Sequence, residues 1–199
     1  MARLPYLERS DLPEEHRSLL DRDINLNKLL AHSPDGARAF SRMGGWIRFK
    51  SRLDPRLREL AILQVGFLTR SPYEWSHHVK LGREFGCSDD DIGAVVTETE
   101  GGDSGLSGLD RAVLRAAREM TTDIAISDTT WAELSQELDA ELITDLTLVI
   151  GFYNMVVRYL GTMQMDVEDS YRPYLDEYPL PKGVYSSSRR TEGRSPVEP

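Results

Sequence analysis

Residues Leu57–Thr69 read as a helix that is apolar almost all round. A helix without a polar face has to be buried, so other elements must cover it on several sides. Asp54 and Pro55 precede this segment and are typical of an N-cap and a first helical turn. We therefore predict a buried helix from Pro55 to about Leu68.

The rest of the chain also has helical periodicity, and no convincing strand pattern interrupts it. Prolines and capping residues mark most of the expected helix starts. In chain order, the expected helices are Leu12 to about Ala31, Pro34–Phe49, Pro55 to about Leu68, Pro72–Gly86, a short helix that opens at Ser88, Leu109 to about Thr122, Asp128–Leu138, and about Ala140–Met163. The fold class that follows is all-α, with about eight helices.

The length of 199 residues suits one domain with a real core. We expect this domain to span residues 1–180, with an N-terminal extension of about 25 residues. The stretch 97–108 is a flexible loop by composition. The tail 181–199 has almost nothing to bury, and we expect it to be disordered or to lie on a partner subunit.

Charge and composition exclude several classes of function. The net charge of -9 argues against nucleic-acid binding, which needs clustered Lys and Arg. The longest nearly apolar run, Leu146–Val157, falls short of the ~20 residues that span a bilayer. The N-terminus has no apolar core of a secretory signal, so a cytoplasmic protein without a membrane partner is expected. The single cysteine, Cys87, excludes an intrachain disulfide and a thiol-pair redox site.

The stretch SPYEWSHHVKLG, residues 71–82, concentrates ionisable and aromatic side chains. On a helix, Glu74 and His78 stand four residues apart inside the apolar stripe, and His77 lies at its margin. An ionisable pair on an apolar face needs partners or loses its charge. Spacing alone leaves two alternatives open: a structural hydrogen-bonded pair, or a general acid/base site with tuned pKa values.

Glu59 is a candidate third member of this group. It lies among Ile62, Leu63 and Gly66 on the buried helix, where a carboxylate has little access to water unless it faces a cavity. Because the connection 69–71 is short, the two helices should be neighbours and Glu59 could approach His78. The alternative is that Glu59 complements the helix dipole in the first turn.

A polar stripe on the last predicted helix contains Thr147, Asn154 and Arg158. Such a stripe meets solvent or lines a pocket, and the solvent alternative is favoured. If it lines a pocket, Arg158 could hold a substrate carboxylate through paired hydrogen bonds.

Metal binding ranks below acid/base chemistry. Glu59, Glu74, His77 and His78 offer ligand atoms, but adjacent histidines diverge by 100° on a helix. Helical zinc sites instead use histidines four residues apart. No glycine-rich phosphate loop with a following lysine occurs, and no Gly-x-Ser-x-Gly elbow.

At these residues the sequence resembles the carboxymuconolactone decarboxylase family of the alkylhydroperoxidase D-like superfamily. The resemblance runs through LDPRLREL (residues 53–60), SPYEWSHH (residues 71–78) and residues 86–92. It implies an all-α alkylhydroperoxidase D-like bundle whose subunits associate as trimers or hexamers.

The peroxidase branch of that superfamily carries a Glu, then Cys-x-x-Cys, then a His four residues later. Glu59 and His78 match the outer members, whereas Ser71 and Glu74 occupy the cysteine positions. Peroxidase activity is therefore not expected. The decarboxylase branch also lacks the thiol pair, and the resemblance to it implies Glu74 and His78 as acid/base residues, with Glu59 orienting the histidine. The N-terminal extension marks a divergent member.

The resulting hypothesis is a cofactor-independent lyase that acts on an unsaturated or cyclic carboxylic acid or lactone, a small-molecule substrate. The expected substrate-binding residues are Tyr73, Trp75, His77, Trp46, Asn154 and Arg158. Trp75 could equally be a core or subunit-interface residue, and for Trp46 that alternative is favoured. An isomerase or hydrolase acting by proton transfer, and a non-catalytic small-molecule-binding protein, remain as alternatives.

Overall fold

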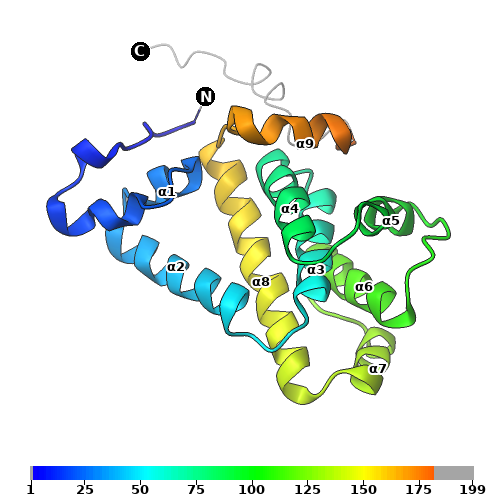
Figure 1. Ribbon diagram of the computed structural model, residues 1–199. Coiled ribbons are helices and arrows are strands. Elements are labelled where there is room, and N and C mark those ends of the chain that lie inside the picture. Colours follow the sequence, from blue (N-terminus) through cyan, green and yellow to red (C-terminus); the bar gives the residue numbers. More distant parts are fainter. Residues whose placement is uncertain (1, 182–199) are drawn as a thin grey trace, which may run out of the picture.

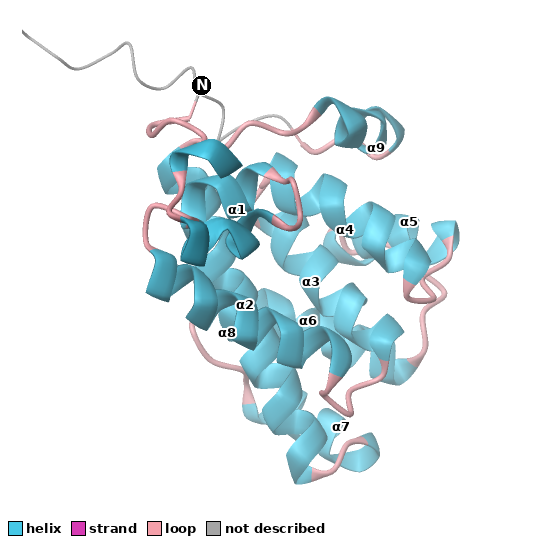
Figure 2. Cartoon of the chain, turned by 60° about the vertical axis from the view of Figure 1, so that its left-hand side comes forward, coloured by secondary structure: helices cyan, strands magenta, loops and turns pink. Residues whose placement is uncertain are grey.

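The computed structural model describes residues 2–181, and these contain helices joined by loops, without a strand (Figures 1 and 2). The elements are η1 (Arg9–Asp11), η2 (Glu14–Leu20), α1 (Asn25–Leu30), α2 (Pro34–Phe49), α3 (Pro55–Leu68), α4 (Pro72–Glu84), α5 (Asp89–Thr99), α6 (Gly108–Thr122), α7 (Asp128–Glu137), α8 (Ala140–Met163), η3 (Asp169–Tyr171) and α9 (Arg172–Glu177), where η denotes a 3-10 helix.

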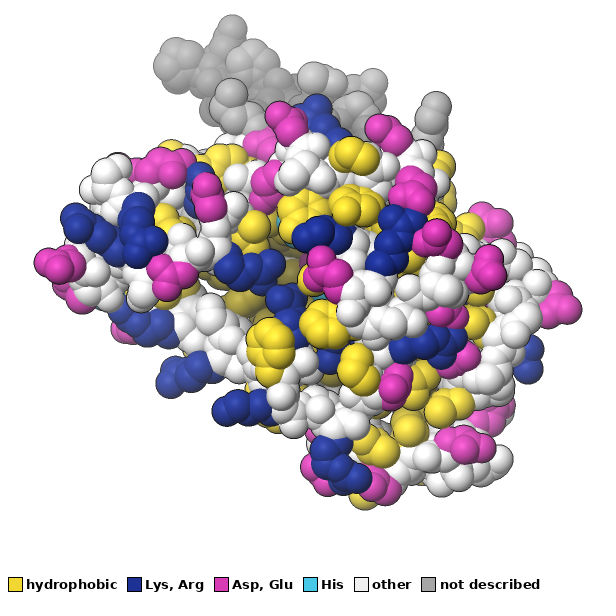
Figure 3. All heavy atoms as spheres, in the orientation of Figure 1, with side chains coloured by type: hydrophobic (Ala, Val, Ile, Leu, Met, Phe, Trp, Pro, Cys, Tyr) yellow, Lys and Arg dark blue, Asp and Glu magenta, His cyan; other side chains and the backbone are white. Residues whose placement is uncertain are grey.

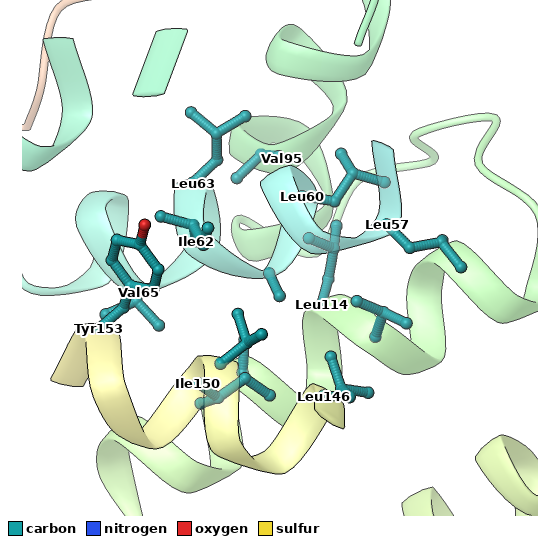
Figure 4. Packing of buried hydrophobic residues seen from close by; sticks show 14 of the residues in the cluster. Leu57, Leu60, Ile62, Leu63, Val65, Val95, Leu114, Leu146, Ile150 and Tyr153 are labelled. Atoms are coloured by element: carbon teal, nitrogen blue, oxygen red, sulfur yellow. The ribbon is translucent and has the colours of Figure 1, made fainter. Parts of the chain in front are cut away.

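Helix α3 forms the centre of the fold. It packs against α4, α5, α6 and α8, and every residue from Leu57 to Phe67 is buried. Leu60 and Leu63 of α3 belong to one continuous core with Leu114 of α6 and Ile150 of α8 (Figure 4). The prediction of a buried helix here is confirmed, and it explains why α3 shows no polar stripe.

Side chains that cap helix N-termini also join α3 to its neighbours. Ser88 and Asp91 form a capping box at α5, and Ser107 and Asp110 form one at α6. Arg56, in the first turn of α3, donates hydrogen bonds to both Asp91 and Asp110. One guanidinium thus holds together the starts of three helices, and its hydrogen bonds to Asp91 and Asp110 raise its pKa, which outweighs the lowering by burial.

Helix α8 is long and apolar enough, by length and composition alone, to cross a membrane. Half of its most apolar window is buried inside the fold, which is the pattern of a core helix. Some large apolar side chains remain exposed nearby, among them Leu148 and Met155 of α8 and Phe49 at the end of α2. A self-associating surface would cover them, and self-association stays a prediction.

The expected first helix, Leu12 to about Ala31, is wrong. The chain forms η2, breaks over residues 21–24, and restarts as the short α1. Leu12, Leu20 and Ala31 form only a small separate apolar cluster, so little burial supports a long helix there. The first amide of α1, that of Asn25, donates instead to Glu168, 143 residues away.

The C-terminal strap, as we name residues 164–181, contains η3 and α9 and was not anticipated. It packs over α4, next to which α9 lies in Figure 1. The indole of Trp75 donates to the carbonyl of Tyr178 at 2.8 Å. The strap also buries His77, which helical periodicity placed at the margin of the apolar face, because Tyr171 stacks on its ring. The predicted tail beyond residue 181 lies outside the described residues.

Replacing Arg56 tests the three-helix junction. We expect Arg56→Met to lower the free energy of unfolding by about 2 kcal/mol, because two buried carboxylates lose a charged hydrogen-bond donor. Chemical denaturation measures this loss. The matched control is Arg52→Met, since the ion pairs of Arg52 with Asp139 and Glu141 are exposed. Equal stabilities of the two variants would contradict the proposed role of Arg56.

Candidate functional site

The candidate site is built on α3 and α4, which pack closely against each other. The connection between them is short, and the amide of Ser71 donates to the carbonyl of Gly66 at 3.0 Å. A Cβ atom at Gly66 would lie 3.4 Å from the backbone nitrogen of Trp75 and 3.6 Å from Cγ of Glu74. These are ordinary van der Waals distances, so the two helices pack in direct contact at Gly66, next to Glu74.

The imidazole of His78 lies between two carboxylates. Its Nδ1 is 2.6 Å from Oε2 of Glu59, and its Nε2 is 3.0 Å from Oε1 of Glu74. All three residues are buried, with exposed fractions of 2% to 4%. The structure thus brings together the three residues that the sequence singled out, and the predicted approach of Glu59 to His78 is present.

Arg58 is a fourth member that sequence reasoning missed. Its Nε and Nη2 both donate to Oε1 of Glu59 at 3.0 Å, and its guanidinium lies over the ring of Phe85. Arg58 is 2% exposed, which is rare for an arginine without a partner. Its position within an otherwise apolar helix, directly before Glu59, was the available signal.

Burial and charge act in opposite directions on the ionisation of this group. Burial alone would lower the pKa of His78, but the neighbouring Glu59 and Glu74 carboxylates raise it to about 9. Burial likewise raises the pKa of Glu59, and the charges of His78 and Arg58 outweigh this and lower it. His78 is therefore an imidazolium at neutral pH, and the buried cluster contains two cations and two carboxylates.

Glu74 differs from Glu59 in its hydrogen bonding. Oε1 of Glu74 is buried, close to His78, and forms no hydrogen bond of good geometry with any described residue. A buried carboxylate oxygen without a full set of donors is costly, which is typical of a group that has a function. Glu74 thus has capacity for a further proton or donor.

A cavity of about 290 Å³ opens above Glu74 and His78. Side chains of α2, α4 and α8 line it, together with residues that precede and begin α1. The lining residues are Arg22, Ile24, Leu26, Asn27, Phe40, Ser41, Gly44, Gly45, Arg48, Phe49, Tyr73, Glu74, His77, His78, Leu81, Phe152, Tyr153 and Val156. Glu59 is absent from this lining and reaches the cavity only through His78.

Tyr153 of α8 forms part of the site and was also missed. Its ring stands edge-on to the imidazole of His78, with centroids 5.0 Å apart. Burial, together with the charges of Glu74 and Glu59, raises the pKa of its phenol, so Tyr153 remains protonated. Periodicity identified Tyr153 only as part of an apolar helix, because its contact with His78 joins residues 75 positions apart.

His77 lines the same cavity but is held differently from His78. Its Nδ1 donates to the carbonyl of Tyr73 at 2.8 Å, and its ring is stacked between Tyr73 and Tyr171. Burial lowers the pKa of His77 to about 3, so it is neutral at pH 7. Tyr73 also contacts the strap, because its hydroxyl donates to Glu168 at 3.0 Å.

Four of the expected substrate-binding residues do not line this cavity. Trp75 is fully buried against Phe67 and the strap, and Trp46 packs on the main core. Asn154 donates to Thr121 of α6 and accepts from Arg158, which is exposed. The polar stripe of α8 therefore meets α6 and solvent, and a role for Arg158 in holding substrate here is not supported.

The described residues 2–181 contain no group of three or more His, Cys, Asp or Glu side chains placed to hold a metal ion. In the cluster around His78, each carboxylate already faces a cation, and Glu59 accepts hydrogen bonds from both Arg58 and His78.

Comparison with solved structures gives closely similar folds. A peroxidase-related protein with an alkylhydroperoxidase AhpD core from Ralstonia eutropha is 21% identical, with a TM-score of 0.74 over 87% of this chain and 95% of that one. A variant of the debrominase Bmp8, in complex with 2,3,4-tribromopyrrole, is 19% identical, with a TM-score of 0.73 over 89% of this chain and 99% of that one. A peroxidase-related protein from Silicibacter sp. is 21% identical, with a TM-score of 0.71 over 85% of this chain and 92% of that one.

The comparison with curated proteins finds no match. The model of the carboxymuconolactone decarboxylase family matches residues 34–119, a segment that includes α3, α4 and the cluster of Glu59, Glu74 and His78. At about 20% identity, the solved structures establish the fold and no shared activity. The matched segment is thus similar to the carboxymuconolactone decarboxylase family, and the chain has the AhpD-like all-α fold.

Proposed function

We propose that the protein is a cofactor-independent lyase of the carboxymuconolactone decarboxylase type, which acts on an unsaturated or cyclic carboxylic acid or lactone. One observation carries this proposal: an imidazolium is held between two carboxylates on the floor of a cavity, and one of these carboxylates has an unsatisfied oxygen. The match of residues 34–119 to the carboxymuconolactone decarboxylase family supports an enzyme, because the namesake of that family is a decarboxylase.

Each member of the cluster has a distinct role in this proposal. His78 is the proton donor, because its raised pKa keeps it charged at neutral pH. Glu74 lines the cavity beside Nε2 of His78 and passes or accepts the proton. Glu59 holds Nδ1 and fixes the orientation of the ring, and Arg58 in turn holds Glu59, so these two are positioning residues.

The reaction consists of one bond cleavage and one protonation. The bond from the substrate carboxyl carbon to the adjacent carbon breaks, and CO₂ leaves. The electron pair moves into the conjugated carbonyl to give a dienolate, so no external electron acceptor is needed. A carbon of the dienolate then takes a proton from the pair of Glu74 and His78, and solvent returns that proton to His78.

The same groups would also serve an enolising isomerase or a hydrolase, which are the second candidates. Dithiol peroxidase chemistry is not proposed, because Cys87 is the sole cysteine. Cys87 is buried, its Sγ faces the carbonyl of Arg56, and burial is the main cause that raises its pKa to about 12. It is also not part of the lining of the cavity.

Turnover in D₂O tests the assignment. NMR of the protein with a panel of unsaturated lactone acids and β-keto acids, carboxymuconolactone included, should show loss of the carboxyl signal and entry of deuterium into the product. Glu74→Gln and His78→Ala should each lower kcat by at least about 100-fold, the usual contribution of a general acid. Glu59→Gln should lower kcat with little change in KM, because Glu59 does not line the cavity.

Glu84→Gln is the matched control, because Glu84 is an exposed glutamate on the same helix. Thermal melts and sedimentation establish which variants keep the fold. Deuterium entry without loss of carbon would favour the isomerase. If Glu74→Gln stays folded with full turnover, the acid–base role of the pair is wrong.

The ionisation of the histidines can be measured directly. NMR titration should show the ring of His78 losing its proton near pH 9, whereas His77 stays neutral down to about pH 3. A His78 that titrates near its ordinary pKa of 6.5 would contradict the charged cluster.

The same shift in the pKa of His78 makes stability depend on pH. Between pH 6.5 and 9 the folded state holds a proton that the unfolded state has lost, so the free energy of unfolding should fall as the pH rises. The full effect is at most about 3 kcal/mol. Below pH 6.5 both states are protonated and this contribution is fully present. Denaturation at pH 6.5 and pH 9 measures the difference.

A further inference from the structure

Two arginines line the cavity on its outer side. Arg22 lies between η2 and α1 and is exposed, and Arg48 lies in the last turn of α2 and is half-buried. Glu74 and His78, in contrast, are 3% and 4% exposed. We call Arg22 and Arg48 the basic mouth of the cavity, and the buried Glu74 and His78 its acid–base floor. On this face of the molecule, Lys and Arg side chains stand around a hollow (Figure 3).

Neither arginine of the mouth has an acidic partner within residues 2–181. The side chain of Arg48 has one ring contact, with its guanidinium 5.9 Å from the centroid of Phe49. Arg52, Arg56, Arg58, Arg83 and Arg115, in contrast, each pair with a carboxylate. Arg42 and Arg158 have no carboxylate partner in the described residues either, but neither lines the cavity. What distinguishes Arg22 and Arg48 is that both stand at one opening.

The floor of the cavity does not cancel this positive charge. Glu59 and Glu74 are balanced by Arg58 and the protonated His78. Glu168 contacts Tyr73 and His77 and adds one negative charge behind the lining, whereas Arg22 and Arg48 place two positive charges in the lining itself. A guanidinium presents donors that match the oxygens of a carboxylate, and the effect is strengthened where water is partly excluded.

Space for a ligand is present beside these arginines. Gly44 and Gly45 of α2 line the cavity, and a Cβ atom at Gly45 would meet no atom within 4 Å. Phe40, Phe152 and Tyr153 supply apolar walls for the body of a ligand. The arrangement suits a small organic carboxylate that has an unsaturated or cyclic body.

We propose that Arg22 and Arg48 form an anion-binding mouth that selects organic carboxylates and orients them toward Glu74 and His78. The catalytic role of Glu74 and His78 rests on the proposed function. The binding of a carboxylate by Arg22 and Arg48 does not depend on that function. Arg22 lies outside the segment 34–119 that matches the family. The N-terminal part of this chain thus supplies a specificity residue outside the matched segment.

The test compares probes that differ in charge and share one skeleton. Calorimetry and NMR shifts measure the binding of cinnamate and cinnamamide, and of benzoate and benzamide, to the full chain. At low salt the carboxylate of each pair should bind at least about tenfold more tightly than its amide. Added salt should reduce this carboxylate-to-amide ratio of affinities.

Variants then assign this preference to residues. Arg48→Met and Arg22→Met should each lower the carboxylate-to-amide ratio several-fold, and Arg48→Lys should keep part of it. Arg42→Met is the control, because Arg42 is an exposed arginine on the same helix that does not line the cavity. Gly45→Leu should weaken both members of a pair alike, because it fills space without changing charge.

Two results would overturn the proposal. One is the absence of any carboxylate preference in both probe pairs. The other is a ratio that both arginine variants leave unchanged while they remain folded. Glu74→Gln should keep the preference even if it loses turnover. A preserved ratio without turnover on any substrate would therefore contradict the proposed lyase and leave the anion-binding mouth intact.

Discussion

The hydrogen bond between Glu59 and His78 is the interaction on which the candidate site depends. It joins α3 to α4 at 2.6 Å, and both partners are almost completely buried. Removing a single charge from water costs several kcal/mol, so neither residue would be stable there alone. The pair persists because Arg58 supports Glu59 and Glu74 faces the other side of the imidazole. The site is thus a buried group of two carboxylates and two cations that neutralise one another.

Much of the architecture around this pair could be predicted from local signals. Pro34, Pro55 and Pro72 begin α2, α3 and α4, and Ser88 begins α5 with its capping box. These signals act within one helical turn, so a sequence displays them directly. The approach of Glu59 to His78 was also accessible, because a short connection forces two buried helices together.

The features that could not be predicted depend on contacts between distant residues. The strap buries one face of α4 through bonds such as the one from Trp75 to Tyr178, and no periodicity encodes that partner. A helical wheel identified the polar stripe of Asn154 but not the neighbour it meets, which proved to be α6. Arg22 and Arg48 are ordinary surface arginines in the sequence, and only the structure shows that they share a cavity and lack acidic partners.

The strap also bears on the order in which the molecule folds. Asp166 accepts from the amide of Ala2 and the hydroxyl of Tyr6, and Glu168 accepts from the amide of Asn25. Each of these contacts closes a loop of more than 140 residues, which is entropically expensive before the intervening helices are in place. The core around α3 needs no such closure. The cluster of Glu59, Glu74 and His78 is therefore expected to assemble early. The N-terminal residues that line the cavity, which the strap holds through Glu168 and Asn25, would be placed last.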